Sequence, residues 1–224
     1  MLVRTWNVFH GNAHPPERRD HLAGMIRLAT ADRPDVLCVQ ELPVWSLARL
    51  EGWSGMSAVA DVAARPLLPA RLAKAITDLH HGVFRSAFTG QANAILLGSA
   101  LGVLERRAAE LDGSEHRICQ AVRLDGGLVV GNLHASGRRR GEAQGELETA
   151  VALVDSLDGR VTILAGDFNL RPALPGFSAP GPGIDHILVR GASAGPVEVW
   201  PVERRTVDGR VLSDHAPVEV RIDV

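Results

Sequence analysis

A serine, an aspartate and a histidine stand in a row near the end of the chain, in the stretch VLSDHAPVEV (211–220). Apolar and polar residues alternate in the second half of this stretch, as they do in a strand, so Ser213, Asp214 and His215 stand just before the strand begins. A histidine beside a carboxylate is a common general base, because the carboxylate fixes the imidazole tautomer and stabilises its protonated form. Adjacent strand residues point to opposite faces, so Asp214 and His215 must lie in a turn to serve one site. Ser213 is expected to hydrogen-bond that turn and to have no catalytic role.

Further polar residues interrupt stretches that otherwise have the composition of buried strands. They are Asn7, Glu41, Asn132, His134, Asp167, Asn169 and Asp185, and most stand at a strand end. Residues two apart on a strand share a face, so Asp167 and Asn169 are expected to point together, as are Asn132 and His134. Each residue alone is more typical of a turn, and only their joint presence indicates one shared site.

These residue types suit the chemistry of a phosphoester. Glu41, Asp214 and Asn7 offer hard oxygen atoms, which together with water suit Mg²⁺ or Mn²⁺ better than zinc. Asn169 and His134 can donate hydrogen bonds to charge that develops on a phosphoryl oxygen. A metal ion, a base and anion-stabilising donors together indicate metal-assisted hydrolysis of a phosphoester.

The elements that must position these groups follow from apolar periodicity, which predicts one α/β domain over residues 1–224. Strands are expected at 2–9, 35–41, 93–98, 117–124, 128–135, 160–169, 184–191, 196–203 and 216–224, and helices at 16–33, 43–53 and 141–157. An Asp-Gly pair predicts a hairpin between 117–124 and 128–135. The segment 54–90 gives no clear pattern beyond a helical composition at 69–83.

The bulk composition narrows the class of protein. A net charge of −2 argues against binding nucleic acid by bulk charge alone. Cys38 and Cys119 lie in apolar stretches and are expected to be buried free thiols, which fits a reducing cytoplasm. The sequence shows neither a secretion signal nor an apolar run of membrane-spanning length, so we expect a cytoplasmic protein. No obligate protein partner is implied.

Six short motifs resemble one known family when they are read in order. They are WN (6–7), QE (40–41), LH (133–134), GDFN (166–169), IDHILV (184–189) and SDHAPVEV (213–220), and together they resemble the endonuclease/exonuclease/phosphatase superfamily. The resemblance implies a four-layered α/β sandwich, with two mixed β-sheets packed face to face, helices outside and an active site at one edge. The wording of SDHAPVEV and of LHAS (133–136) is most similar to the pancreatic-type deoxyribonuclease branch.

The resemblance also implies a metal site and a base. Glu41 would be the principal ligand of Mg²⁺ or Mn²⁺, with Asn7 and Asp214 assisting. His215 would activate the attacking water and would be oriented by Asp185.

The remaining expected site residues would meet the substrate. By resemblance, Asp167 positions the water or assists the leaving group, and Asn169 and His134 bind the scissile phosphate. Asn93 lies in ANAIL, where relatives often have GNAIL, and is expected with Asn132 to line the substrate site. The arginine run after His134 could hold flanking phosphates, although a solvated loop is an equal alternative; it comprises Arg138, Arg139 and Arg140.

Some features depart from named branches of the family. Abasic-site nucleases have an aspartate where this chain has Phe9, and they use a tyrosine, which this chain lacks. The glutamate and arginine that pancreatic-type enzymes place near the counterpart of His134 and the DNA backbone have no evident match in 54–110, and no disulfide is expected.

Three functions therefore stay open at this point. The first is a nuclease or phosphodiesterase, and the second is a hydrolase of a small phosphoester such as a sugar, nucleotide or lipid head group, because one fold can serve both. The third is a non-catalytic binding module, which the presence of every expected ligand and of the base disfavours.

Overall fold

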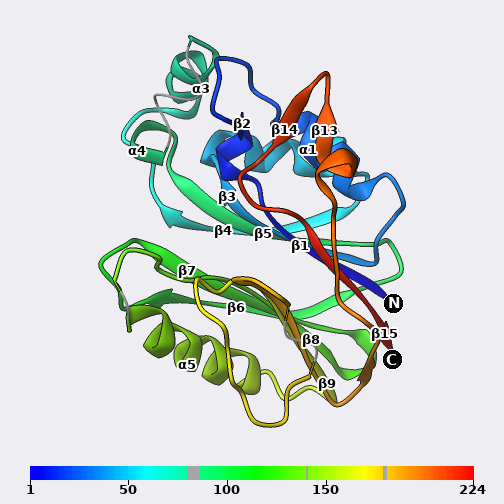
Figure 1. Cartoon of the computed structure of the whole chain (residues 1–224). Coiled ribbons are helices and arrows are strands. Elements are labelled where there is room, and N and C mark those ends of the chain that lie inside the picture. Colours follow the sequence, from blue (N-terminus) through cyan, green and yellow to red (C-terminus); the bar gives the residue numbers. More distant parts are fainter. Residues whose placement is uncertain (80–85, 140, 179–180) are drawn as a thin grey trace.

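Two β-sheets pack face to face and helices cover their outer faces, as the computed structural model shows for residues 1–79, 86–139, 141–178 and 181–224 (Figure 1). The first sheet has the strand order β11 (Ser193–Ala194), β15 (Val218–Asp223), β1 (Leu2–Asn7), β3 (Val36–Leu42), β5 (Gln91–Leu97) and β4 (Ser57–Ala64), with β12 (Glu198–Val199) also paired to β15. The second has the order β10 (Asp185–Arg190), β9 (Val161–Asp167), β8 (Leu128–His134), β7 (Arg117–Leu124) and β6 (Val103–Leu111). Both sheets are mixed, because β1 runs parallel to β3 and β8 runs parallel to β9. The expected α/β sandwich is confirmed.

The helices lie outside the two sheets. They are α1 (Leu22–Thr30), α2 (Leu50–Ser54), α3 (Ala70–Leu79), α4 (Ser86–Thr89) and α5 (Glu142–Asp155). Helix α1 packs Leu22, Met25 and Ile26 against the outer face of the first sheet, and α5 packs Leu147 and Val154 against that of the second. A small third sheet of β13 (Thr206–Val207), β14 (Arg210–Leu212) and β2 (Ala13–His14) lies beside α1 (Figure 1).

The core between the sheets is apolar because both inner faces carry branched side chains. Val3, Ile95 and Val220 from the first sheet meet Val130 and Ile163 from the second. Burial of each such side chain contributes about 1.5–3 kcal/mol to folding. The sandwich is therefore a rigid support for the loops at its edge.

A buried charge network ties the last strand to the first helix. The Arg4 guanidinium is fully buried against the Trp200 ring, 4.6 Å from the ring centroid. Its Nε donates to Glu219 at 2.6 Å, and its two terminal nitrogens donate to Asp32 at 2.9 and 2.8 Å. Because β1 and β15 are neighbours, this network holds the C-terminal strand against the N-terminal one.

Several expected boundaries were wrong. The helix expected from residue 16 begins at Leu22, since Asp20 turns the chain by accepting the Leu22 N–H at 2.9 Å. Of the strand expected at 196–203 only Glu198–Val199 pairs, and Pro201, which lacks a backbone N–H, follows it closely. Strands β4 and β6 were not among the predicted strands, and both are edge strands with largely exposed or half-buried residues.

Further expectations from the composition and from short sequence patterns can be compared with the structure. Cys38 and Cys119 are buried and unpaired, as expected. The hairpin at 125–127 is present, with positive φ angles of 75° at Gly126 and 74° at Gly127. Among the described residues, no helix is long and apolar enough to span a bilayer. The cytoplasmic location stays a prediction.

Candidate active site

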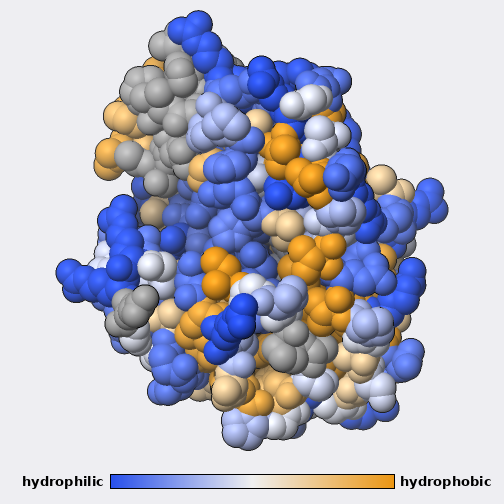
Figure 2. All heavy atoms as spheres, in the orientation of Figure 1, coloured by the Kyte–Doolittle hydropathy of each residue, from blue (hydrophilic) through white to orange (hydrophobic). Residues whose placement is uncertain are grey.

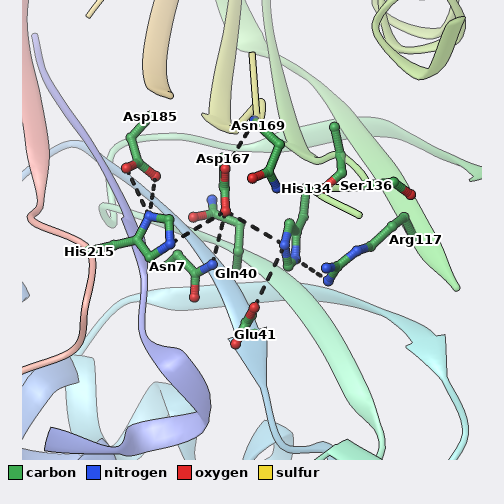
Figure 3. A network of polar contacts seen from close by, with 12 residues as sticks. Asn7, Gln40, Glu41, Arg117, His134, Ser136, Asp167, Asn169, Asp185 and His215 are labelled. Atoms are coloured by element: carbon green, nitrogen blue, oxygen red, sulfur yellow. Dashed lines mark hydrogen bonds and ion pairs between the residues drawn. The ribbon is translucent and has the colours of Figure 1, made fainter. Parts of the chain in front are cut away.

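The polar strand ends meet at one edge of the sandwich, between the two sheets (Figure 3). Parallel strands end at the same edge: β1, β8 and β9 end there with Asn7, His134 and Asp167, and β3 ends one residue after Glu41. Strand β10 runs antiparallel to β9 and so begins at this edge, with Asp185 opposite Asp167. Segments from both ends of the chain thus converge on one site.

A tight backbone approach aligns β8 with β9. Gly166 has a φ of +144°, and a Cβ added there would lie 1.8 Å from the carbonyl oxygen of Leu133. Only glycine fits at this position. It lets His134 lie directly opposite Asp167 in the parallel pair.

His215 and Asp185 form a hydrogen-bonded pair. The His215 Nδ1 lies 2.9 and 3.2 Å from the two carboxylate oxygens of Asp185. The turn expected at Ser213 is present: the Ser213 hydroxyl donates to the carbonyl of Asn7 at 2.7 Å and accepts the His215 N–H at 3.1 Å. Trp6 adds a bond from its indole nitrogen to the His215 carbonyl at 3.0 Å. The imidazole is therefore held by the first strand.

The carboxylates control the charge of His215. Burial on its own lowers the pKa of His215, but the hydrogen bond to Asp185 and the charges of Asp185, Asp167 and Asp214 outweigh it and raise the pKa to about 9. For Asp167, burial and the charge of Asp185 raise the pKa well above its usual range, although His215, Asn7 and Asn169 oppose this. In the metal-free protein the imidazole is cationic at neutral pH.

Asp167 lies at the centre of the site. It accepts hydrogen bonds from the Asn7 side-chain amide at 3.0 Å and from the backbone N–H of Asn169 at 3.1 Å. Its Oδ2 lies 3.8 Å from the His215 Nε2 and 3.6 Å from the His134 Nε2. Asp167 therefore connects the two histidines across the site.

His134 has a defined tautomer. The Gln91 amide nitrogen and the Arg117 guanidinium both lie 3.0 Å from its Nδ1, and both are donors, so Nδ1 is the acceptor. The proton is then on Nε2, which faces Glu41 at 3.7 Å and Asp167 at 3.6 Å. Burial, followed by the Arg117 charge, holds the pKa of His134 well below its ordinary value. His134 is thus a neutral hydrogen-bond donor.

Glu41 faces the Nε2 of His134, as Asp167 does. It has a φ of +56°, which is strained for a residue other than glycine. Its second carboxylate oxygen lies 3.5 Å from the His10 Nε2. Within the described part of the chain it has no arginine or lysine partner, and its side chain is 18% exposed. An accessible carboxylate that has no arginine or lysine partner among the described residues fits a hard divalent cation.

A second group of carboxyl and histidine atoms also has the spacing of a metal site. One ligand atom from each of Asp167, Asp185 and His215 lies within 4.8 Å of the others. Asp185, however, already binds the His215 Nδ1 through both oxygens, as a base and its orienting carboxylate do. The geometry of this group therefore suits proton transfer, whereas the Glu41 carboxylate is open to a metal ion.

The loop after His134 is clamped from helix α5. The buried carboxylate of Glu146 accepts hydrogen bonds from the Ser136 backbone N–H at 2.5 Å and from its hydroxyl at 2.6 Å. Asn169, with a φ of +50°, donates its side-chain amide to the carbonyl of Ala135 at 2.8 Å. Glu146 and Asn169 together fix the direction in which the chain leaves His134.

The structure separates some of the expected residues from the site. The expectation that Asn132 lines the substrate site is corrected. Its side chain is fully buried between the sheets, where it contacts Gln40 and two backbone carbonyls and cannot meet substrate. Asn93 is also buried and donates to the carbonyl of Ile118. Asp214 is exposed and affects His215 through its charge, but no contact joins it to Glu41 among the described residues.

The expected arginine run divides. Arg138 lines a cavity beside the site, Arg139 is exposed and pairs with Glu142 at 3.6 Å, and Arg140 lies outside the described residues.

Sequence reasoning missed His10, Gln91 and Arg117. Gln91 shares a strand face with Asn93, and Arg117 opens the strand 117–124, so both positions carried a weak indication of the site. Gln91 and Arg117 occupy the place beside His134 for which no partner could be identified from the sequence.

A sandwich of two mixed sheets with a histidine–carboxylate pair facing an accessible glutamate defines a metal-assisted phosphoester hydrolase. A model of the Endonuclease/Exonuclease/phosphatase family matches residues 5–215, and the chain belongs to this family of hydrolases. Comparison with curated proteins gave no match.

Solved structures share the fold at low sequence identity. A conserved protein of unknown function from Enterococcus faecalis V583 has 16% identity and a TM-score of 0.71, with 100% of this chain and 99% of that chain covered. D. rerio TDP2 humanized by 14 mutations has 17% identity and a TM-score of 0.72, with the same shares covered. The mannosyl-6-phosphatase Bt3783 of Bacteroides thetaiotaomicron VPI-5482 has 16% identity and a TM-score of 0.68, with 100% of both chains covered. The similarity to the pancreatic-type branch stays a prediction.

Proposed function

We propose that the protein is a Mg²⁺- or Mn²⁺-dependent phosphodiesterase that cleaves nucleic acid. The observation that carries the proposal is the His215–Asp185 pair, at 2.9 Å, opposite the neutral donor His134 and the accessible Glu41. This arrangement supplies a base on one side of a phosphate and donors with a cation site on the other.

The residues divide the reaction between them. The His215 Nε2 accepts the proton of the attacking water, while Asp185 holds the Nδ1 proton and stabilises the imidazolium that forms. The Nε2–H of His134 donates to a phosphoryl oxygen, and the Asn169 amide has a second N–H available for another. Asp167 orients the water between the histidines.

Glu41 would hold the metal ion, with Asn7 and Asp214 as the assisting ligands that the sequence resemblance implies, and the His10 Nε2 lies 3.5 Å from the Glu41 carboxylate. A bound divalent cation supplies positive charge that neutralises phosphoryl oxygens and offsets the carboxylates that keep His215 protonated. The neutral imidazole that a base requires is thereby favoured in the loaded enzyme.

The charge of the site favours a diester over a monoester. A diester carries one negative charge at neutral pH, whereas a monoester carries nearly two, since its second pKa is about 6. Glu41 and Asp167 lie 3.7 and 3.6 Å from the His134 Nε2, and Asp185 and Asp214 act on His215 by their charge, so these carboxylates disfavour the second charge. A small monoester remains the alternative that the experiment below separates.

The test uses protein stripped of metal, with and without added Mg²⁺ or Mn²⁺. Supercoiled plasmid, bis(4-nitrophenyl) phosphate and 4-nitrophenyl phosphate are offered to the natural protein, to His215→Ala and to the control His14→Ala, whose histidine is exposed. We expect metal-dependent nicking and diester turnover, lost in His215→Ala and kept in the control. Turnover of the monoester alone would support the alternative, and full activity in His215→Ala would disprove the assignment of the base.

The metal assignment has a separate readout. Glu41→Gln should weaken Mn²⁺ binding about 10- to 100-fold, measured by electron paramagnetic resonance of free Mn²⁺. Unchanged Mn²⁺ affinity in Glu41→Gln would remove Glu41 from the ligand set.

A further inference from the structure

A cavity of about 570 Å³ opens beside His134. Its walls come from the end of β4 and the residues that follow it (63–65 and Leu67), from Gln91 at the start of β5, from the β6–β7 turn and the first residue of β7 (114–117), and from Arg138 after β8. Figure 2 shows mainly hydrophilic residues in the hollow between the two halves of this face. The volume falls in the range of cavities that bind small ligands.

The cavity is continuous with the active site. Gln91 and Arg117 both line it, and both donate to the His134 Nδ1 at 3.0 Å. A group bound in the cavity therefore lies one side chain away from the donor that faces the scissile phosphate.

The lining has an excess of positive charge. The lining includes Arg65, Arg117 and Arg138, against Glu115 as the single carboxylate among the described lining residues. The oxygens of Glu115 are already engaged by Arg117 at 3.0 Å, by the Gly137 N–H at 2.8 Å and by the Arg138 N–H at 3.3 Å. Glu115 therefore supports the wall of the cavity, and the cavity keeps a net positive charge.

Two of the arginines can turn toward a ligand. The Arg138 side chain is 80% exposed, and its Nε lies 3.8 Å from Glu115, which is too far for a strong hydrogen bond. Arg65 is exposed and has no ion pair within the part of the chain that the structure describes. An arginine presents a rigid fork of donors that matches a phosphate.

The lining also has an apolar side. Ala63, Ala64 and the 74% exposed Leu67 lie next to Arg65. Charged and apolar surfaces side by side suit a nucleoside that is followed by its phosphate, because sugar and base pack on apolar groups while the phosphate binds arginine.

We propose that this cavity binds the nucleotide next to the scissile bond and that Arg65 and Arg138 hold its far phosphate. The inference rests on the proposed function, since it assumes that the bond cleaved is a phosphodiester. The substrate class becomes a strand with at least two consecutive phosphates, instead of an isolated diester.

The test separates binding from hydrolysis. Dithymidine monophosphate is compared with the same dinucleotide carrying an extra phosphate at its 5′ end or at its 3′ end. Affinities are measured by calorimetry with metal-free protein in chelator, and kcat/KM is then measured with Mn²⁺. The variants are Arg65→Gln, Arg138→Gln and the control Arg160→Gln, whose exposed arginine lies at the start of β9, at the opposite edge of the sheet.

We expect one of the two phosphorylated dinucleotides to bind about tenfold more tightly than the plain one, which corresponds to one charged hydrogen bond. Arg65→Gln and Arg138→Gln should each reduce that ratio at least threefold, and Arg160→Gln should not change it. Equal affinity for all three dinucleotides, or a ratio that survives both variants, overturns the inference. Tight binding of a phosphorylated dinucleotide without any hydrolysis in Mn²⁺ overturns the proposed function and leaves the cavity assignment standing.

Discussion

The substitution Asp185→Asn tests the electrostatic basis of the site most directly. It keeps the size of the side chain and removes the charge that lies 2.9 Å from the His215 Nδ1. In the natural protein this carboxylate makes the largest contribution that raises the pKa of His215, which reaches about 9 against an ordinary value of 6.5.

The expected magnitude follows from these values. The shift from 6.5 to about 9 corresponds to about 3 kcal/mol of preference for the imidazolium, at 1.36 kcal/mol for each pKa unit. Without Asp185, burial opposes the charges of Asp167 and Asp214 and favours the neutral ring. We therefore expect the pKa of His215 to fall by about two units or more in Asp185→Asn.

The assay is a titration of the metal-free protein, followed through the two-bond ¹H–¹⁵N correlations of its 9 histidines. The His215 signal is assigned by its loss in His215→Gln. The control is Asp214→Asn, whose carboxylate is exposed and acts only through its charge, so the pKa should fall much less.

The same shift has a consequence for folding. A raised pKa stabilises the folded protein below the unfolded value of 6.5, and this contribution is lost as the pH rises through about 9. Over this pH range the natural protein should lose stability in urea unfolding as His215 loses its proton. Asp185→Asn should not show this part of the loss. If His215 titrates at the same pH in Asp185→Asn as in the natural protein, the reasoning about the pair is refuted.

Three further predictions concern the framework of the site, and each is measured by urea unfolding. Glu219→Ala leaves the Nε of the buried Arg4 without its partner, while Asp32 still accepts from the terminal nitrogens, and should cost about 3–5 kcal/mol; a loss below about 1 kcal/mol would show that Asp32 alone suffices. Glu146→Ala removes both bonds to Ser136 and should cost about 2–4 kcal/mol, whereas the exposed control Glu148→Ala should change stability by less than about 0.5 kcal/mol. Gly166→Ala forces a Cβ into the backbone of the neighbouring strand and should prevent folding; soluble protein of natural stability would contradict the close approach.

Much of the fold could be predicted because the inner strands are almost entirely apolar. Strands such as 160–169 and 184–191 are buried on both faces or nearly so, and their composition marks them whatever their partners. Two strands that were not predicted, β4 and β6, lie at sheet edges, where exposed residues need no apolar alternation.

The candidate site could be predicted in part for a related reason. Asp167, Asp185 and His215 interrupt apolar strands, and such an interruption is visible in one dimension. Asn132 interrupts a strand in the same way, yet it satisfies backbone carbonyls in the core, so the pattern cannot tell a core amide from a site amide. Gln91 reaches His134 from the facing sheet and Arg117 reaches it from the neighbouring strand, and the sequence shows neither arrangement.

The left-handed backbone at the site has a consequence for how this protein could be altered. Residues other than glycine with positive φ include His10, Glu41, Asn169 and Ser213, and each is at or beside the active site. Holding such a residue costs on the order of 1 kcal/mol, which glycine would not require. A selection for heat resistance alone would therefore favour glycine at these positions and would erode the site while it strengthened the fold. Conversely, the more stable the rest of the sandwich is, the more of these strained active-site residues the chain can tolerate.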